Sequence, residues 1–171
     1  MKNLINFYLK KGQLIKDRNM TSLSQGYLEK AKHNLLTMKI LSEIQENKKA
    51  RNLLEIPSYY NSNEWVVITG YYAMYTAALA LLAKIGLRSK NHSATLLILE
   101  EYFLKKKSLD EKDLSLIKNA QFQKEEIEKI SDARHKREIA QYSITKQTTK
   151  DIAEKIKKDA YTFVNKVEEI L

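Results

Sequence analysis

A basic cluster near the C-terminus contains the residues best suited to chemistry. Arg134, Lys136 and Arg137 lie within four consecutive residues, and Tyr142 follows Arg137 by five. A guanidinium group can bind a phosphate through two parallel hydrogen bonds, and Arg134 and Arg137 would share one face of a helix. Tyrosine, with an ordinary pKa of about 10, is a poor general base at neutral pH. The cluster therefore predicts phosphate binding and puts catalysis in question.

A structural explanation of the same residues also stands. Arg134 could pair with Glu138, four residues later on a helix, and Tyr142 could pack at the edge of the core. Arg137 and Tyr142 would be about 140° apart on a straight helix. They converge only if the helix ends or kinks between them, or if a second subunit supplies one of them.

Other signatures of catalysis are missing from the sequence. The four glycines, at positions 12, 26, 70 and 86, are too scattered for a phosphate-binding loop. His33, His92 and His135 stand alone, so we expect no metal site and no cofactor. The chain has no cysteine, which excludes disulfides and thiolate ligands and is consistent with a cytoplasmic location.

The charge of the chain favours a polyanionic or acidic partner. The net charge is +9, of which residues 1–62 carry +6, residues 63–107 carry +3 and residues 108–171 carry none. Fixed positive charge attracts RNA or DNA and releases counterions on binding. The alternative is that these lysines belong to ordinary solvated helix faces.

The elements that would position these residues are helical. The chain has four glycines and one proline, too few turn signals for a sheet of many short strands. Apolar spacings of three and four predict helices over residues 23–50, 64–85, 92–102, 108–137 and 148–171, and no strand. The expected caps are Ser62 or Asn63, Gly86, Asn91, the Ser108 to Glu111 capping box, and Thr148 with Asp151.

Nineteen residues without a charge, Trp65 to Ala83, could by length alone span a membrane. Three tyrosines, at positions 71, 72 and 75, lie in the middle of this segment and not at the membrane interfaces, and many Ala and Thr stand where a lone membrane helix would prefer Leu and Ile. We therefore expect the central helix of a soluble bundle and no membrane. The predicted fold is an all-α antiparallel bundle of about five helices with a four-helix up-and-down core. Residues 1–20 form an arm or short helix, and residues 21–171 form one domain.

Two segments resemble a known family. Residues 70–93, GYYAMYTAALALLAKIGLRSKNHS, and residues 133–142, ARHKREIAQY, are similar to motifs of the HEPN superfamily, in its prokaryotic stand-alone branch. The likeness runs from about residue 23 to the C-terminus, with the motifs in the right order. The resemblance implies a helical bundle that usually dimerises, and in many relatives a paired Arg and His that cleave RNA without metal. Several relatives are toxins neutralised by a minimal nucleotidyltransferase.

Carried onto this chain, the resemblance makes Arg137 the motif arginine. Tyr142 stands in the region where the ribonuclease form has its histidine, so the histidine is missing. The cleft would include Arg134, Lys136, His92 and Tyr72 as residues that contact RNA or a nucleotide, although His92 could instead serve only in packing. Two functions stay open: a toxin–antitoxin protein that binds RNA or nucleotide with degenerate, metal-independent ribonuclease activity, or a non-catalytic helical subunit that binds a minimal nucleotidyltransferase.

Overall fold

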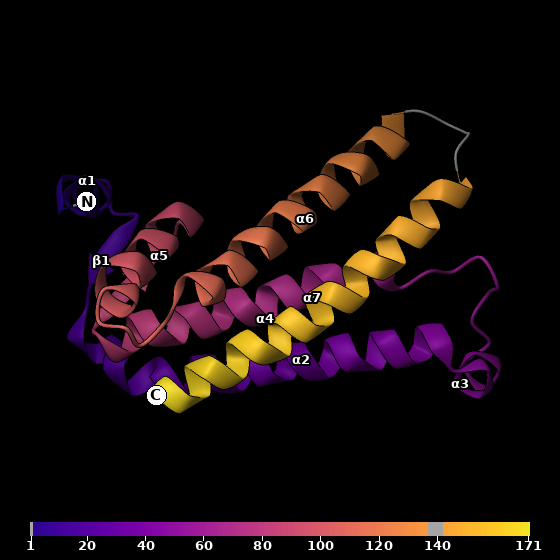
Figure 1. Cartoon of the computed structure of the whole chain (residues 1–171), viewed down its shortest axis with the longest axis horizontal. Coiled ribbons are helices and arrows are strands. Elements are labelled where there is room, and N and C mark those ends of the chain that lie inside the picture. Colours follow the sequence, from indigo (N-terminus) through magenta and orange to yellow (C-terminus); the bar gives the residue numbers. More distant parts are fainter. Residues whose placement is uncertain (1, 137–141) are drawn as a thin grey trace.

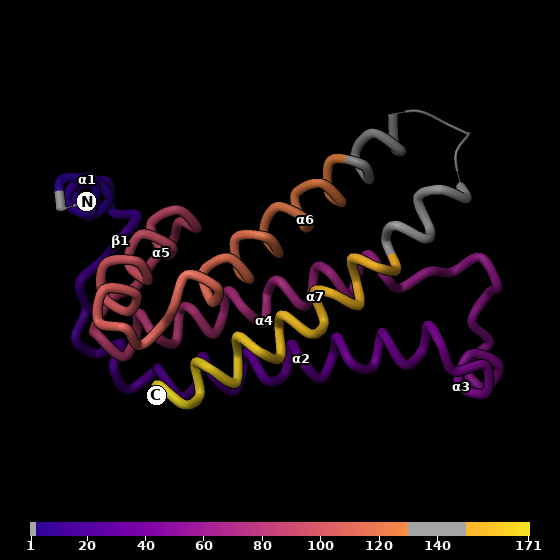
Figure 2. Tube along the Cα trace, in the orientation of Figure 1, coloured from indigo at the N-terminus to yellow at the C-terminus, as the bar shows by residue number. Residues whose placement is uncertain are grey.

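Four long helices lie side by side, and each runs back along the one before it (Figure 1). They are α2 (Ser24–Glu46), α4 (Asn63–Lys84), α6 (Glu111–Lys136) and α7 (Tyr142–Ile170). The structure is a computed structural model that describes the backbone of residues 2–136 and 142–171 and the side chains of residues 3–129 and 150–171 (Figure 2). The all-α up-and-down bundle predicted from the sequence is confirmed.

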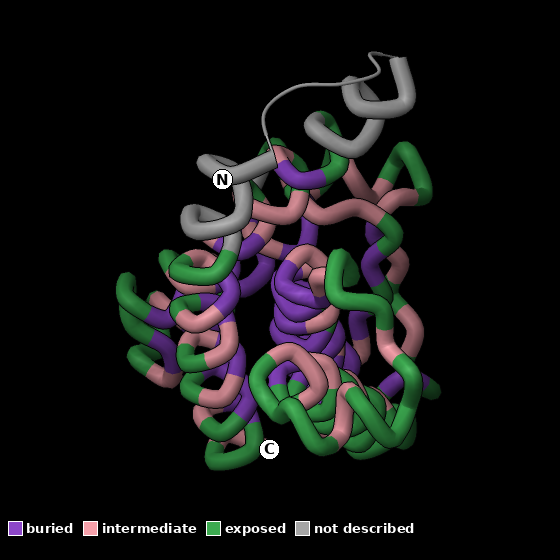
Figure 3. The backbone as a smooth tube through the Cα atoms, turned by 90° about the vertical axis from the view of Figure 1, so that its right-hand side faces the viewer, coloured by how far each residue is buried: buried purple, intermediate pink, exposed green. Residues whose placement is uncertain are grey.

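The uncharged segment forms the centre of this bundle. α4 packs against α2, α6 and α7, and 72% of its most apolar 18-residue window is buried. By length and composition α4 could cross a membrane, but its apolar side chains are covered by the neighbouring helices. Buried residues gather in the interior of the bundle and exposed ones on its outside (Figure 3). The expectation of a buried central helix is confirmed.

Shorter elements connect the long helices. They are α1 (Lys2–Lys10), β1 (Leu14–Lys16), the 3₁₀ helix η1 (Arg18–Leu23), α3 (Lys48–Leu53), β2 (Leu87–Ser89), α5 (His92–Leu99) and the π-helical turn η2 (Glu100–Leu104). Because Asn47 accepts hydrogen bonds from the N–H groups of Lys49 and Ala50, a new helix begins there. The helix predicted over residues 23–50 is therefore divided between α2 and α3.

The predicted helix caps are partly confirmed. Gly86 follows α4 with a φ of +70° and donates its N–H to the Ala83 carbonyl at 2.8 Å, as a glycine after a helix end does. Asn91 caps α5 by accepting from the Ala94 N–H at 3.0 Å. Ser62 precedes α4, but its hydroxyl donates to the Leu41 carbonyl of α2 instead of capping the helix.

Two predicted helix starts are wrong. The capping box that begins α6 is formed by Asp110 and Asp113, whose side chains each accept the other's backbone N–H at 2.9 Å. The spacing from Ser108 to Glu111 fits the same consensus, but α6 begins only at Glu111. The last helix begins at Tyr142, ahead of the predicted start at Thr148.

The prediction of no strand is also wrong. β1 and β2 pair antiparallel, with Ile15 opposite Arg88, and Asp17 donates its N–H to the Gly86 carbonyl at 2.9 Å. Leu14 is only 2% exposed and Met20 5% exposed. A three-residue strand shows no alternating pattern of its own, so this pairing could not be predicted locally. It attaches the first twenty residues to the connection that leads into α5.

α2, α4 and α7 approach one another closely at Gly70. A Cβ atom at this position would lie 2.7 Å from Cγ2 of Ile156 and 3.0 Å from Sδ of Met38. Such distances require the neighbouring side chains to move. By contrast, a Cβ atom at Gly26, which is exposed on α2, would have no neighbour within 4 Å.

We expect the Gly70→Ala variant to be less stable than the wild type, with its unfolding midpoint lowered by about 3 to 6 °C. Alanine favours the helix by up to about 1 kcal/mol, but overpacking costs about 1–3 kcal/mol. Gly26→Ala is the matched control and should leave the midpoint unchanged or raise it slightly. Thermal unfolding followed by circular dichroism measures both; equal midpoints for the two variants would contradict the close packing at Gly70.

Candidate functional site

Two of the residues predicted to contact a ligand, His92 and Tyr72, lie against the same buried side chain. This side chain is Tyr71 of α4, which is 1% exposed. Its hydroxyl is hydrogen-bonded to Nδ1 of His92, the first residue of α5. The Tyr72 ring lies 5.4 Å from the Tyr71 ring, measured between centroids. His92 thus joins the start of α5 to the centre of the bundle.

Tyr75 completes a group of four rings, which we call the aromatic cluster: Tyr71, Tyr72, Tyr75 and His92. The Tyr75 ring lies 4.3 Å from the imidazole of His92, and its plane is within 15° of the Tyr71 plane at 5.9 Å. Ring pairs at these distances attract one another beyond their apolar burial. Each ring is therefore held by its neighbours.

Lys124 of α6 adds a positive charge to the aromatic cluster. Its ammonium nitrogen lies 5.7 Å from the centroid of Tyr71 and 5.6 Å from that of Tyr72, within the range of a cation–π interaction. The same nitrogen pairs with Glu128 at 2.8 Å. In the sequence Lys124 looks like any lysine of a solvated helix face, and only the packing of α6 against α4 brings it to the cluster.

Burial shifts the pKa of three members of the cluster, Tyr71, Tyr75 and His92. It raises the pKa of Tyr71 and of Tyr75, and for Tyr75 a hydrogen bond with Thr95 acts in the opposite direction. Burial and then the charge of Lys124 lower the pKa of His92, with Glu125 acting in the opposite direction. These shifts favour the uncharged forms of Tyr71, Tyr75 and His92. The cluster can therefore stack on a ligand and exchange hydrogen bonds with it, while Lys124 carries the positive charge.

The connection between α4 and α5 fixes the position of His92. Gly86 makes the turn, and Leu87, which is 7% exposed, packs into the core. The Ser89 hydroxyl donates to the Asn91 carbonyl at 2.8 Å, and Thr95 donates to the same carbonyl at 3.0 Å. The pairing of β2 with β1 supports the connection from outside. These contacts hold His92 at the start of α5.

The remaining predicted site residues are not tested by the structure. Arg137 lies outside the described residues, and so do the side chains of Arg134, Lys136 and Tyr142. The described part of α6 extends to Lys136 and that of α7 begins at Tyr142. Among the residues that the structure describes, no three His, Asp or Glu side chains are grouped so that they could hold a metal ion.

The hydrogen bond between Tyr71 and His92 should contribute measurably to stability. Tyr71→Phe leaves the imidazole without its partner, so we expect the free energy of unfolding to fall by about 1 kcal/mol and the midpoint by about 2 to 4 °C. Tyr72→Phe removes a hydroxyl that makes no hydrogen bond within the described residues. It should melt like the wild type. Thermal unfolding tests the pair; a Tyr71→Phe midpoint equal to that of Tyr72→Phe would show that the bond contributes nothing.

Comparison with known proteins agrees with this architecture. The HEPN domain family matches residues 44–170, which include α4, the connection to His92, α6 and α7. The chain is also similar to a UPF0332 protein of Archaeoglobus fulgidus, with 38% identity over 98 residues. This alignment covers 57% of the chain and 67% of the relative. On the extent of the family match, the chain belongs to the HEPN domain family.

Proposed function

We propose that this HEPN protein binds RNA or a nucleotide and acts in the cytoplasm as part of a toxin–antitoxin-type system. The observation that carries the proposal is the aromatic cluster beside Lys124, whose rings belong to the family motif of residues 70–93. The β1–β2 pairing supports the connection that leads to His92. Aromatic rings and a cation suit a ligand that has both bases and phosphates. The net charge of +9 supports the same class of ligand, because it favours encounter with a polyanion.

The proposed roles of the residues follow from their chemistry. Arg137 would neutralise a phosphate, with Arg134 and Lys136 adding positive charge, and His92 and Tyr72 would contact the ligand beside them. Tyr142 stands where a histidine would be the general base, so we propose binding with a degenerate, metal-independent ribonuclease activity that is slow at neutral pH. The protein would act as a homodimer, as HEPN domains commonly do, so that a second copy can complete the site.

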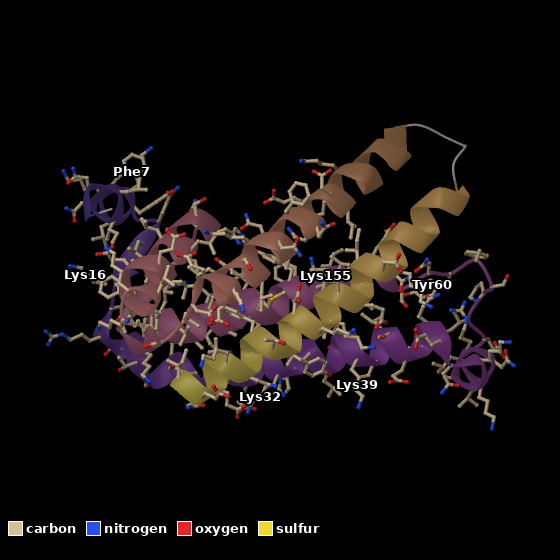
Figure 4. The ribbon with its side chains drawn as sticks, in the orientation of Figure 1. Phe7, Lys16, Lys32, Lys39, Tyr60 and Lys155 are labelled. Atoms are coloured by element: carbon tan, nitrogen blue, oxygen red, sulfur yellow. The ribbon has the colours of Figure 1, made fainter. Side chains whose placement is uncertain are left out.

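A specific surface favours the second candidate function, an interaction subunit for a minimal nucleotidyltransferase. α3 and the connection after it expose several large apolar side chains at one end of the bundle, where Figure 4 shows Tyr60. We call them the α3 patch: Leu53, Leu54, Tyr59 and Tyr60, of which Leu53 is 84% exposed and Tyr59 76% exposed. Exposed apolar patches are typical of protein–protein contacts. This patch is separate from the aromatic cluster.

RNA binding and cleavage test the first candidate. Purified protein is incubated with single-stranded RNA in the presence of a chelator, and binding is followed by fluorescence anisotropy. We expect binding that Arg137→Ala weakens by about tenfold, since one charge-assisted phosphate contact is lost, and any slow cleavage should persist with chelator and disappear in the variant. Arg18→Ala, which removes an exposed guanidinium from η1, is the control and should bind nearly as well as the wild type. The RNA proposal fails if neither protein cuts RNA and Arg137→Ala changes no binding.

Copurification tests the second candidate. The chain is coexpressed with a minimal nucleotidyltransferase, and the complex is captured through the partner. Leu53→Asp places a charge in the α3 patch and should reduce the yield of complex at least tenfold. Ile40→Asp, on an exposed part of α2 at 50% exposure, is the matched control and should leave it intact. Equal yields from the two variants would exclude the α3 patch as the contact.

A further inference from the structure

A groove lies between α2 and α4. Its volume is about 300 Å³. The residues that line it are Tyr27, Lys30 and Asn34 of α2 and Thr69, Tyr72, Tyr75, Thr76 and Leu79 of α4. Small-molecule sites begin at about this volume. The groove is therefore suited to one nucleotide and is too small for a protein helix.

Three tyrosine rings border the groove, and two of them are positioned by the aromatic cluster. Tyr75 is held between Tyr71 and His92, while Tyr72 is held by Tyr71 and by the ammonium group of Lys124. The Tyr72 side chain remains 41% exposed. A ring that is exposed and already fixed can stack on a planar ligand with little loss of conformational entropy.

The polar groups of the groove differ in how much hydrogen-bonding capacity they have left. The hydroxyls of Thr69 and Thr76 donate back to carbonyls of α4, those of Trp65 and Tyr72, at 2.6 Å. The Asn34 amide and the Lys30 ammonium make no hydrogen bond or ion pair within the described residues. The nearby Lys32, in contrast, pairs with Glu168 at 2.7 Å. One amide and one cation thus face solvent beside the rings.

We propose that this groove binds one unpaired nucleobase of a single-stranded RNA. The base stacks on Tyr72, the Asn34 amide donates to and accepts from the edge of the base, and Lys30 pairs with the adjacent phosphate. A duplex does not fit, because its bases are stacked within the helix and cannot enter the groove. The inference rests on the proposed binding of RNA or nucleotide and places that binding on the α2 side of the aromatic cluster.

The test measures how tightly the protein binds a fluorescein-labelled single-stranded oligoadenylate, and how tightly it binds the same strand annealed to oligouridylate. Tyr72→Leu removes the ring but keeps apolar bulk, so we expect single-strand binding to weaken about 5- to 50-fold. Asn34→Ala should weaken it by a smaller factor. Tyr72→Phe keeps the ring and should recover most of the binding that Tyr72→Leu loses, which distinguishes stacking from a contact of the hydroxyl. Duplex binding should be the same in all of these proteins.

Two controls match these substitutions elsewhere on the surface. Tyr102→Leu makes the same change at a tyrosine that is 36% exposed and does not line the groove. Lys39→Ala removes an exposed lysine from α2 that is also outside the groove (Figure 4). Lys30→Ala should reduce the slope of log affinity against log salt by about one, and by more than Lys39→Ala does. Thermal unfolding establishes that each variant is folded.

The outcomes separate this inference from the proposed function. If the wild type binds the single strand and Tyr72→Leu binds it equally well, the groove is not the site and the RNA-binding proposal stands. If the wild type binds neither the single strand nor AMP, the proposed function fails and the inference fails with it. If Tyr72→Leu converts a dimer to a monomer in light scattering, the groove contacts a second copy and the inference is overturned.

Discussion

The rest of the structure depends on the burial of α4. This helix is uncharged over nineteen residues and carries apolar side chains around most of its circumference. It is therefore stable in water only when other helices cover it. α2, α6 and α7 provide that cover, and the close approach of α2 and α7 at Gly70 depends on the absence of a side chain there. Tyr72 of this helix remains 41% exposed.

Burial of α4 also determines the chemistry at its surface. Tyr71 lies inside the bundle, where an unpaired hydroxyl would be costly, and His92 satisfies it. Burial raises the pKa of Tyr71 and lowers the pKa of His92, which favours their uncharged forms, and the positive charge beside the rings is that of Lys124 on α6. The packing of Tyr71, its hydrogen bond to His92 and the contact of Lys124 with its ring therefore all depend on the burial of α4.

The first twenty residues show how a segment outside a family match can contribute to a site. The HEPN match begins at residue 44, whereas β1 pairs with the strand that leads into His92. Backbone hydrogen bonds from Asp17 and Lys90 join the two segments on either side of that pairing. The arm thus restricts the connection between α4 and α5, and through it the aromatic cluster, although it supplies none of the cluster's side chains.

The sequence by itself determined the features that depend on neighbouring residues. Helical periodicity predicted the bundle, Gly86 and Asn91 marked one helix end and one helix start, and the family motif led to His92 and Tyr72. The sequence did not distinguish the capping box at Asp110 from the one expected at Ser108, because both fit the same local pattern. Only the tertiary structure decided that β1 pairs with β2, that Tyr71 bonds His92 and that Lys124 lies over the tyrosines. These contacts join residues far apart in the chain, and their energy comes from packing that no local spacing encodes.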